Sequence, residues 1–203
     1  MPAIDVTQSA PSLGRRWLKP AVFAAALSPL IWLIALAATG GLGANPIEAT
    51  TRYLGDWALR MLLIALAVTP LRLLTGLTEL ARLRRTLGLF AFFYVCLHAL
   101  SYVGLDQFFD WPAIWADIVK RVYITIGMAA TATLLPLALT STNGMVKRLG
   151  ARTWRRLHRA VYAAGVLGVL HYFFMIKAGY QEPAVYAAIL LVLLAIRAAK
   201  RWP

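Results

Sequence analysis

The chain has 203 residues, of which 61% are hydrophobic and only 14% are charged, and it carries a formal net charge of +13. Soluble domains are about 45–50% apolar and about 25% charged, so this composition excludes an ordinary soluble protein and indicates an integral membrane protein. The mean hydropathy of +0.68 agrees with that class. Nucleic-acid binding is not indicated, because the Lys and Arg residues stand in short runs between apolar segments, as topology signals do.

Residues 1–19 are polar and basic, and we expect them to form a cytoplasmic tail. Arg15, Arg16 and Lys19 precede an apolar run, as in a signal peptide. However, the run is longer than the apolar core of a typical signal peptide, and no clear cleavage site ends it. The run covers residues 20–39 without a charge, which is long enough to cross a bilayer. It is therefore predicted to be a retained first transmembrane helix.

Five more apolar segments follow, and each must be helical, because a bilayer offers no hydrogen-bond partners to an open backbone. The sequence thus predicts an all-α integral membrane protein, with a single six-helix transmembrane domain over residues 20–199 and a short tail at 200–203. The six spans are expected at about 20–39, 56–74, 87–105, 120–139, 154–176 and 183–198.

Helix breakers and polar residues define the connections. A loop is expected up to residue 55, because Gly40, Gly41, Asn45 and Pro46 follow the first span. Pro136 is expected to interrupt the fourth span. The connection between the third and fourth spans, DQFFDWPAIWAD, is acidic and aromatic, which is typical of a membrane interface.

The distribution of Lys and Arg predicts the orientation. Sixteen of the 21 lie on one side of the six-span arrangement: at the two termini, between the second and third spans, and between the fourth and fifth. The other five lie on the opposite side, together with six of the eight acidic residues. Because positive residues are enriched on the cytoplasmic side of membrane proteins, both termini are expected in the cytoplasm.

The histidines are the main candidate functional residues, since an imidazole inside a membrane span is costly and suggests a functional site by default. His98 lies in the outer half of the third span, and His171 lies in the outer half of the fifth. Two imidazoles at one depth on different helices could bind one haem iron from both sides, which favours electron transfer. The alternative is that each histidine only hydrogen-bonds a neighbouring helix.

His158 stands at the cytoplasmic end of the fifth span. It could bind a second haem, contact a haem propionate or a flavin phosphate, or belong to a solvated basic face. On an ideal helix it points roughly 220° away from His171, so a common face would require a kink or local unwinding. If the third and fifth helices are neighbours, arginines that suit anionic cofactor groups or lipid headgroups should converge on it. These are Arg84, Arg85, Arg155, Arg156 and Arg159.

Three stretches carry a resemblance to a known family: LGLFAFFYVCLHALSYV (87–103), KRVYITIGMAATATLLPLALTS (120–141) and RTWRRLHRAVYAAGVLGVLHYFFMIK (152–177). They resemble the MsrQ (YedZ) family, the haem-binding membrane subunits of bacterial periplasmic protein-methionine-sulfoxide reductase systems. This family looks like a compact branch of the ferric-reductase-like transmembrane superfamily. The resemblance extends from about Thr39 to the C-terminus, and the RRLHR and LHYFF contexts make it specific.

The resemblance implies haem b, as one group or two, and FMN as cofactors, with His98, His171 and His158 as the matching haem histidines. Relatives among the NADPH oxidases carry two histidines on each of two helices, and this chain lacks one of the four. Family membership also implies a location in the bacterial inner membrane. The acceptor would be a periplasmic molybdopterin subunit that reduces methionine sulfoxide in proteins.

The residues themselves agree with an electron-transfer subunit. No dinucleotide-binding GxGxxG motif occurs in a strand–turn–helix context, so the electron donor is expected to be a separate cytosolic flavin reductase or a membrane quinol. The outer connections are short and carry no catalytic constellation, so substrate reduction is expected on a partner protein. Two alternatives are a free-standing ferric or quinone reductase of the same architecture, and a cofactor-free transporter or assembly protein.

Overall fold

A computed structural model describes residues 13–200, and within this range the chain forms helices and connecting segments, with no strand. The predicted cytoplasmic tail lies outside the described residues up to residue 12, and helix α1 already begins at Leu13. The long helices are α1 (Leu13–Ala38), α2 (Pro46–Thr75), α3 (Arg84–Leu100), α5 (Val122–Leu139), α8 (Ala160–Met175) and α9 (Gln181–Ala199). The short ones are η1 (Thr78–Arg82), the π-helix η2 (Ser101–Asp106), α4 (Trp111–Lys120), α6 (Asn143–Leu149) and α7 (Ala151–Leu157).

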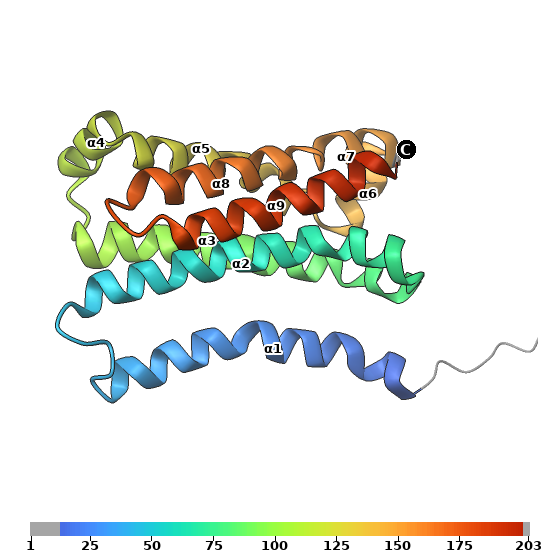
Figure 1. The fold of residues 1–203 in the computed structure, drawn as a ribbon, viewed down its shortest axis with the longest axis horizontal. Helices are drawn as coiled ribbons and strands as arrows, with labels where there is room; N and C mark the ends of the chain where they lie inside the picture. The colour runs from blue at the N-terminus through green and yellow to red at the C-terminus, as the bar shows by residue number, and fades with distance from the viewer. Residues whose placement is uncertain (1–12, 201–203) are drawn as a thin grey trace, which may run out of the picture.

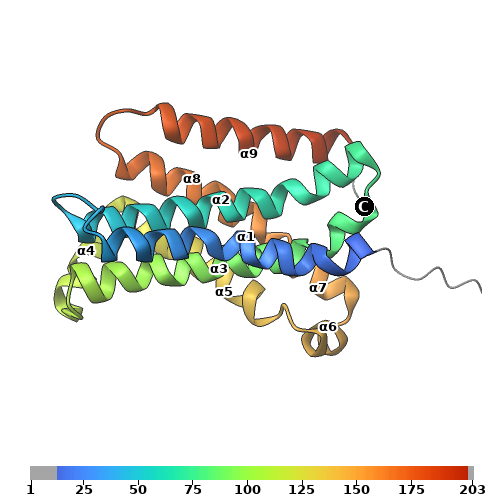
Figure 2. The same cartoon turned by 90° about the horizontal axis from the view of Figure 1, so that it is seen from below.

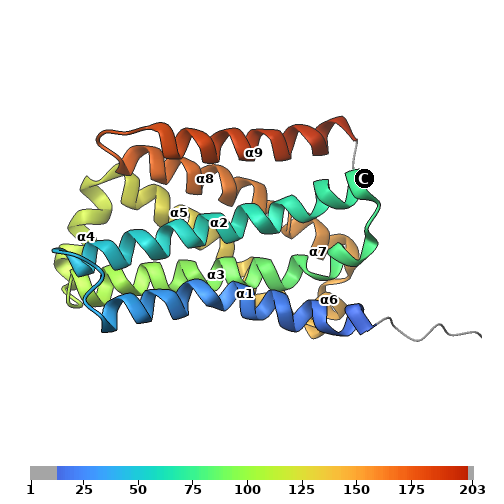
Figure 3. The ribbon, with the colours of Figure 1, turned by 60° about the horizontal axis from the view of Figure 1, so that its bottom comes forward.

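The long helices run side by side along one axis and form a bundle (Figures 1 and 2). Two pairs pack most closely, α2 with α3 and α5 with α8. Helix α9 covers α2 and α8, and α1 lies along α2 and α3 (Figure 3). Helix α4 lies at one end of the bundle. Helices α6 and α7 lie at the other end, together with the start of α1 and the end of α9 (Figure 1).

Five of the six predicted spans correspond to helices that are long and apolar enough to cross a membrane: Trp17–Ala38, Pro46–Thr75, Arg84–Asp106, Val122–Leu139 and Gln181–Ala199. Helix α8 is apolar but has only 16 residues, so the count of six spans stays a prediction. The expected fifth span over residues 154–176 is not one helix. It is divided into α7 and α8 at His158 and Arg159. This break is a local unwinding of the kind that His158 and His171 would need in order to share one face.

Helix α2 is the centre of the bundle, with 56% of its most apolar window buried, against 17–28% for the other four candidate spans. It begins ten residues earlier than predicted, since the stretch expected to be a loop is helical from Pro46. The Asn45 side chain caps it by accepting from the Glu48 N–H at 3.2 Å, and proline is well tolerated at a first helical position. Arg60 is accommodated inside α2 because its Nε donates to the Tyr186 hydroxyl of α9 at 2.8 Å.

One further expectation differs from the structure. Pro136 does not interrupt the fourth span, because α5 continues through it to Leu139. The single cysteine, Cys96, lies inside the apolar helix α3 with its side chain exposed on the surface of the bundle. In a membrane that surface faces lipid, so an apolar environment does not require burial within the protein.

Helix α1 is held by two tyrosine hydroxyls near Pro29, one of its two internal prolines. Proline has no N–H, so the Ala25 carbonyl lacks its usual helical donor, and the Ser28 hydroxyl donates to it instead at 2.9 Å. One turn away, Tyr94 of α3 donates to the Ala26 carbonyl at 2.8 Å, and Tyr53 of α2 donates to the Pro29 carbonyl at 3.0 Å. These contacts attach α1 to the α2–α3 pair at one position along its length.

Helix α9 is attached to α2 by a buried arginine. Pro70 removes the N–H that would pair with the Leu66 carbonyl within α2. Arg197 of α9 donates from Nη2 to this carbonyl at 2.5 Å and is only 8% exposed. Its guanidinium also lies 5.0 Å from the centre of the Tyr162 ring of α8, a cation–π contact. One side chain thus joins three helices.

Candidate functional site

The structure brings His98 and His171 together near the end of the bundle where α4 lies. His98 is on α3 and His171 is on α8, and their ring centroids are 6.1 Å apart with an interplanar angle of 78°. Both side chains are half-buried. Each histidine therefore comes from a different one of the two closely packed helix pairs.

The imidazole of His98 rests against α2. Its Nδ1 lies 2.8 Å from the Thr51 carbonyl oxygen. One helical turn later stands Gly55, where an added Cβ would lie 3.0 Å from Cε1 and 3.1 Å from Nδ1 of the ring. The absence of a side chain at Gly55 is what lets the ring reach the carbonyl.

The imidazole of His171 rests against α5 in the same way. Its Nδ1 lies 2.6 Å from the Tyr123 carbonyl oxygen. One turn later stands Gly127, where an added Cβ would lie 2.8 Å from Nδ1 and 2.9 Å from Cε1. Real Cβ atoms essentially never approach so closely, so a larger residue here would displace the ring.

We call each combination of a carbonyl at position i and a glycine at position i+4 a seat. The two seats are TRYLG in α2 and YITIG in α5, and each belongs to the partner helix of the one that carries the histidine. Sequence reasoning missed Thr51, Gly55, Tyr123 and Gly127. A signal was present, because glycine inside a helix costs about 1 kcal/mol relative to alanine and so needs a packing or functional reason.

The seats determine which ring nitrogen is available to a ligand. A carbonyl oxygen can only accept, so Nδ1 of both His98 and His171 must carry the proton and donate. In the neutral rings, Nε2 then keeps its lone pair, which is the usual second-sphere arrangement of a metal-binding histidine. Imidazole nitrogens bind first-row metals at about 2.0–2.1 Å and lie about 1 Å from the ring centre, so two rings on one metal have centres about 6 Å apart. The observed separation of the two rings fits this value.

A cavity of about 300 Å³ lies at the other end of the bundle, and we call it the basic cavity. Half of its lining residues are leucines and alanines, mostly of α2, α3 and α5. Its polar side chains come from α3, from the connection after α5, and from the α7 region: Arg84, Arg85, Ser141, Trp154 and His158. A mainly apolar wall with a few convergent polar groups is typical of a small-molecule site.

His158 is held in this cavity by aromatic stacking. Its ring stacks on Trp154 with centroids 3.8 Å apart, and the Trp154 indole N–H donates to the Thr140 carbonyl at 2.9 Å. Its Nδ1 lies 3.0 Å from the Trp154 carbonyl, and its Nε2 lies 3.4 Å from the Ser141 hydroxyl. The chain's other two histidines are paired near the opposite end, so neither of them faces His158.

Only part of the predicted arginine cluster converges on the basic cavity. Arg84 and Arg85 line it together with His158, and Arg85 also donates to the Asn143 side chain of α6 at 2.5 Å. Arg155, which was expected to join them, is exposed on α7 and does not line the cavity, and the same holds for Arg156 and Arg159. Arg155 and Arg156 lie in α7, and Arg159 follows it. Successive side chains of a helix point in different directions, so these three do not share a face with Arg84 and Arg85.

Comparison with known proteins gives the family. Residues 54–169 match the model of the ferric reductase like transmembrane component. This range contains the seat in α5, His98, His158 and the basic cavity, while Thr51 and His171 lie just outside it. The chain is 65% identical over 177 residues to the protein-methionine-sulfoxide reductase heme-binding subunit MsrQ of Rhodospirillum rubrum, covering 87% of this chain and 85% of that protein.

Other relatives carry the same name. The MsrQ subunit of Caulobacter vibrioides is 50% identical over 173 residues, covering 85% of this chain and 82% of that protein. The MsrQ subunit of Herminiimonas arsenicoxydans is 50% identical over 188 residues, covering 91% of this chain and 86% of that protein. The chain therefore belongs to the MsrQ family, a family of ferric-reductase-like transmembrane proteins.

Proposed function

We propose that this chain is the haem b-binding membrane subunit of a methionine-sulfoxide reductase system and carries electrons across the membrane to a partner. Support comes from the names of relatives that are up to 65% identical to it. It also comes from the two facing histidines inside an all-helical membrane bundle. A haem held by His98 and His171 would supply one-electron redox chemistry, with its potential set by these two histidines and their surroundings.

The pair His98 and His171 is the observation that carries this proposal. Among residues 13–200, no group of three or more His, Cys, Asp or Glu side chains could hold a bare metal ion. Two imidazoles alone would suit a metal whose other ligands come from its own cofactor, as in haem. The protein's own contribution is to leave both Nε2 lone pairs available, which the two seats do by accepting both Nδ1–H groups, on rings whose centroids are 6.1 Å apart.

The proposed topology has six spans with both termini in the cytoplasm of the bacterial cell, and the chain lies in the inner membrane. Helix α8 is the sixth span, because its 16 residues rise by about 24 Å and contain no Lys, Arg, Asp or Glu. The start of α1 and the end of α9 lie at the same end of the bundle, as an even number of crossings requires (Figure 1). That end also holds the basic connections, in agreement with the positive-inside rule.

The basic cavity is the proposed site of electron input from the cytoplasm. Arg84 and Arg85 suit the phosphate of a flavin such as FMN, or a carboxylate, because guanidinium groups pair well with both. His158 stacked on Trp154 provides a flat wall for an aromatic ring system. No second histidine faces His158, which favours this role over ligation of a second haem. The donor would be a separate cytosolic flavin reductase or a membrane quinol.

The proposed acceptor is a periplasmic molybdopterin subunit that reduces methionine sulfoxide in proteins. The histidine pair lies near the end of the bundle opposite the basic cavity, so an electron that enters at one face would leave at the other. The chain would therefore separate the donor and the acceptor by the thickness of the membrane and connect them only through its cofactors. This division of labour distinguishes it from a free-standing ferric or quinone reductase.

A spectrum and a haem assay of the purified protein test the proposal. The wild type should show the absorption of a low-spin haem b and at least one haem per chain in a pyridine haemochrome assay. His98→Ala and His171→Ala should each lose most of this haem, while His158→Ala should keep it. Wild-type protein without haem, or both ligand variants with a wild-type spectrum, would refute the assignment. Co-purification with a periplasmic reductase subunit tests the partner separately.

A further inference from the structure

The two histidines depend on two different helix pairs, so something must fix the pairs relative to each other. His98 and its seat belong to α3 and α2, and His171 and its seat belong to α8 and α5. At the end where the histidines lie, the chain passes from the first pair to the second through η2, a short turn and α4. Contacts that set the spacing of the two imidazoles are therefore expected in this connecting segment.

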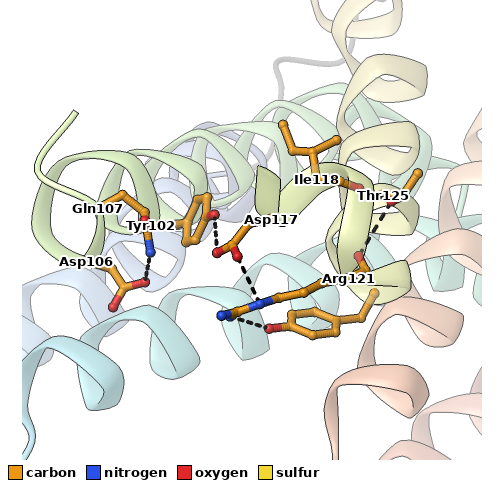
Figure 4. Close-up of polar contacts among 8 residues, drawn as sticks. Tyr102, Asp106, Gln107, Asp117, Ile118, Arg121 and Thr125 are labelled. Atoms are coloured by element: carbon orange, nitrogen blue, oxygen red, sulfur yellow. Dashed lines mark hydrogen bonds and ion pairs between the residues drawn. The ribbon is translucent and has the colours of Figure 1, made fainter. Parts of the chain in front are cut away.

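A hydrogen-bond network runs along this segment (Figure 4). Tyr102 of η2 donates its hydroxyl to Asp117 Oδ2 of α4 at 3.0 Å. The other carboxylate oxygen, Oδ1, lies 3.0 Å from Arg121 Nε. Arg121 in turn donates from Nη1 to the Tyr123 hydroxyl at 3.2 Å. Asp117 thus uses both carboxylate oxygens, one toward each helix pair.

Both ends of the network are adjacent to the seats of the histidines. Tyr102 stands one helical turn beyond His98 on the same continuous helical segment. Tyr123 is the residue whose backbone carbonyl accepts from His171. A second link reinforces the α4–α5 junction, since the Thr125 hydroxyl donates to the Ile118 carbonyl at 2.5 Å (Figure 4). The network therefore spans from the helix of one histidine to the seat of the other.

Asp117 is the more buried partner of its ion pair with Arg121. Its side chain is 16% exposed, whereas the side chain of Arg121 is 52% exposed. An ion pair with one shielded partner is less screened than a pair on an open surface. The backbone at Arg121 is extended rather than helical, with φ −107° and ψ 99°, so α5 is not a simple continuation of α4. Without the network, the first turn of α5 would be free to shift relative to α3.

We propose that Asp117 is a positioning residue for the His98–His171 pair, holding the seat of His171 in register with the helix that carries His98. The proposal rests on the haem site proposed above, because its consequence is a change in how the two imidazoles bind one metal. Asp117 itself touches neither ring in the contacts of the described residues. Loosening the network should alter ligand geometry and leave the ligands present.

The test uses three variants of the full-length protein in nanodiscs. Asp117→Ala removes both arms of the network, and Tyr102→Phe removes one arm with little change in shape. Asp106→Ala is the matched control, since Asp106 is an exposed acid at the same end whose side chain, among residues 13–200, accepts from the neighbouring Gln107 and stands outside the network. Each variant is measured for haem per chain, for its low-spin electron paramagnetic resonance signal, and for the midpoint potential of the haem.

The expected result is a haem-loaded Asp117→Ala protein with a shifted low-spin signal and a shifted midpoint potential. Tyr102→Phe should shift both in the same direction by a smaller amount, and Asp106→Ala should match the wild type. If Asp117→Ala fails to fold or to bind haem, Tyr102→Phe decides alone. Wild-type signals and potentials in Tyr102→Phe, or in both variants, would overturn the proposal.

A haem-independent measurement separates this proposal from the proposed function. Amide hydrogen exchange in the first turn of α5 should be about tenfold faster in Asp117→Ala than in the wild type, with or without haem. If the wild type binds no haem, the proposed function fails while the exchange still tests the network. If haem binds as proposed but exchange in α5 is unchanged in Asp117→Ala, the positioning role is wrong and the proposed function stands.

Discussion

The ring of His171 occupies the space where a side chain at Gly127 would begin, since a Cβ at that position would lie 2.8 Å from the ring Nδ1. The same relationship holds between His98 and Gly55, with a slightly larger distance of 3.0 Å to the nearest ring atom. In both cases the glycine stands one turn after the residue whose carbonyl accepts from the imidazole. Both helix pairs therefore position their histidine in the same way, with a backbone carbonyl and a glycine one turn later on the partner helix.

Gly127→Ala should displace the imidazole of His171 and break its hydrogen bond to the Tyr123 carbonyl. Overpacking of this kind costs about 1–3 kcal/mol, so haem affinity should fall by roughly 5- to 150-fold. Haem titration of the apoprotein measures this. Gly55→Ala should have a smaller effect in the same direction, because its added Cβ meets the ring at a larger distance.

Gly168→Ala is the matched control for both glycine variants. Gly168 lies in α8, the helix of His171, and an added Cβ there would make only an ordinary contact of 3.4 Å with Leu59 Cδ1. Its haem affinity should match the wild type. Equal losses in Gly168→Ala and Gly127→Ala would show that any added methyl group in the bundle weakens haem binding, and the seat would then have no special role.

The topology predicts which positions can be labelled from outside the cell. If α8 crosses the membrane, the segment after it, around Gly179, faces the periplasm, and α6 faces the cytoplasm. In a Cys96→Ser background, Ala178→Cys should react with a membrane-impermeant maleimide on intact spheroplasts, whereas Gly144→Cys should react only after lysis. The reverse pattern would exclude the proposed orientation, and reaction of both sites from outside would exclude a membrane-spanning α8.

The basic cavity predicts a defect in haem reduction without loss of haem. Arg84→Ala combined with Arg85→Ala removes two cations from the cavity wall, so an anionic flavin or a docking donor should bind less well. Stopped-flow reduction by a cytosolic flavin reductase should then be about tenfold slower or more, while the spectrum stays that of the wild type. The control is Arg152→Ala, which changes an exposed basic residue of α7, and its haem should be reduced at the wild-type rate. If haem in the double variant is reduced at the wild-type rate, Arg84 and Arg85 have no role in electron input and serve only as topology signals.

The sequence was sufficient for the features that depend on long runs of residues. Long, mainly apolar segments located all five helices that the structure identifies as candidate spans, and the shared depth of His98 and His171 indicated that they belong together. These signals are strong because lipid imposes one requirement, internal hydrogen bonding, on every residue of a span.

The sequence was not sufficient for the features that depend on which helices touch. The start of α2 was missed because its first turns are polar, although Asn45 and Pro46 form a good helix start. The seats at Gly55 and Gly127 were missed because the role of each glycine depends on the imidazole ring that packs against it from another helix. Arg155 does not line the cavity that Arg84 lines, because residues that are close in charge pattern need not share a face.

A double-mutant cycle tests the contact that attaches α9 to α2. Arg197→Leu removes the donor to the Leu66 carbonyl, which Pro70 leaves without a helical partner. A buried carbonyl that loses its partner costs about 1–3 kcal/mol, so the variant should unfold at a correspondingly lower denaturant concentration in detergent. Pro70→Ala restores a backbone N–H to that carbonyl. In the Pro70→Ala background, therefore, Arg197→Leu should cost less than it does alone, and the difference is the coupling between the two residues. Equal costs in both backgrounds would show that Arg197 stabilises the bundle through its packing on Tyr162 and that the carbonyl contact contributes nothing measurable.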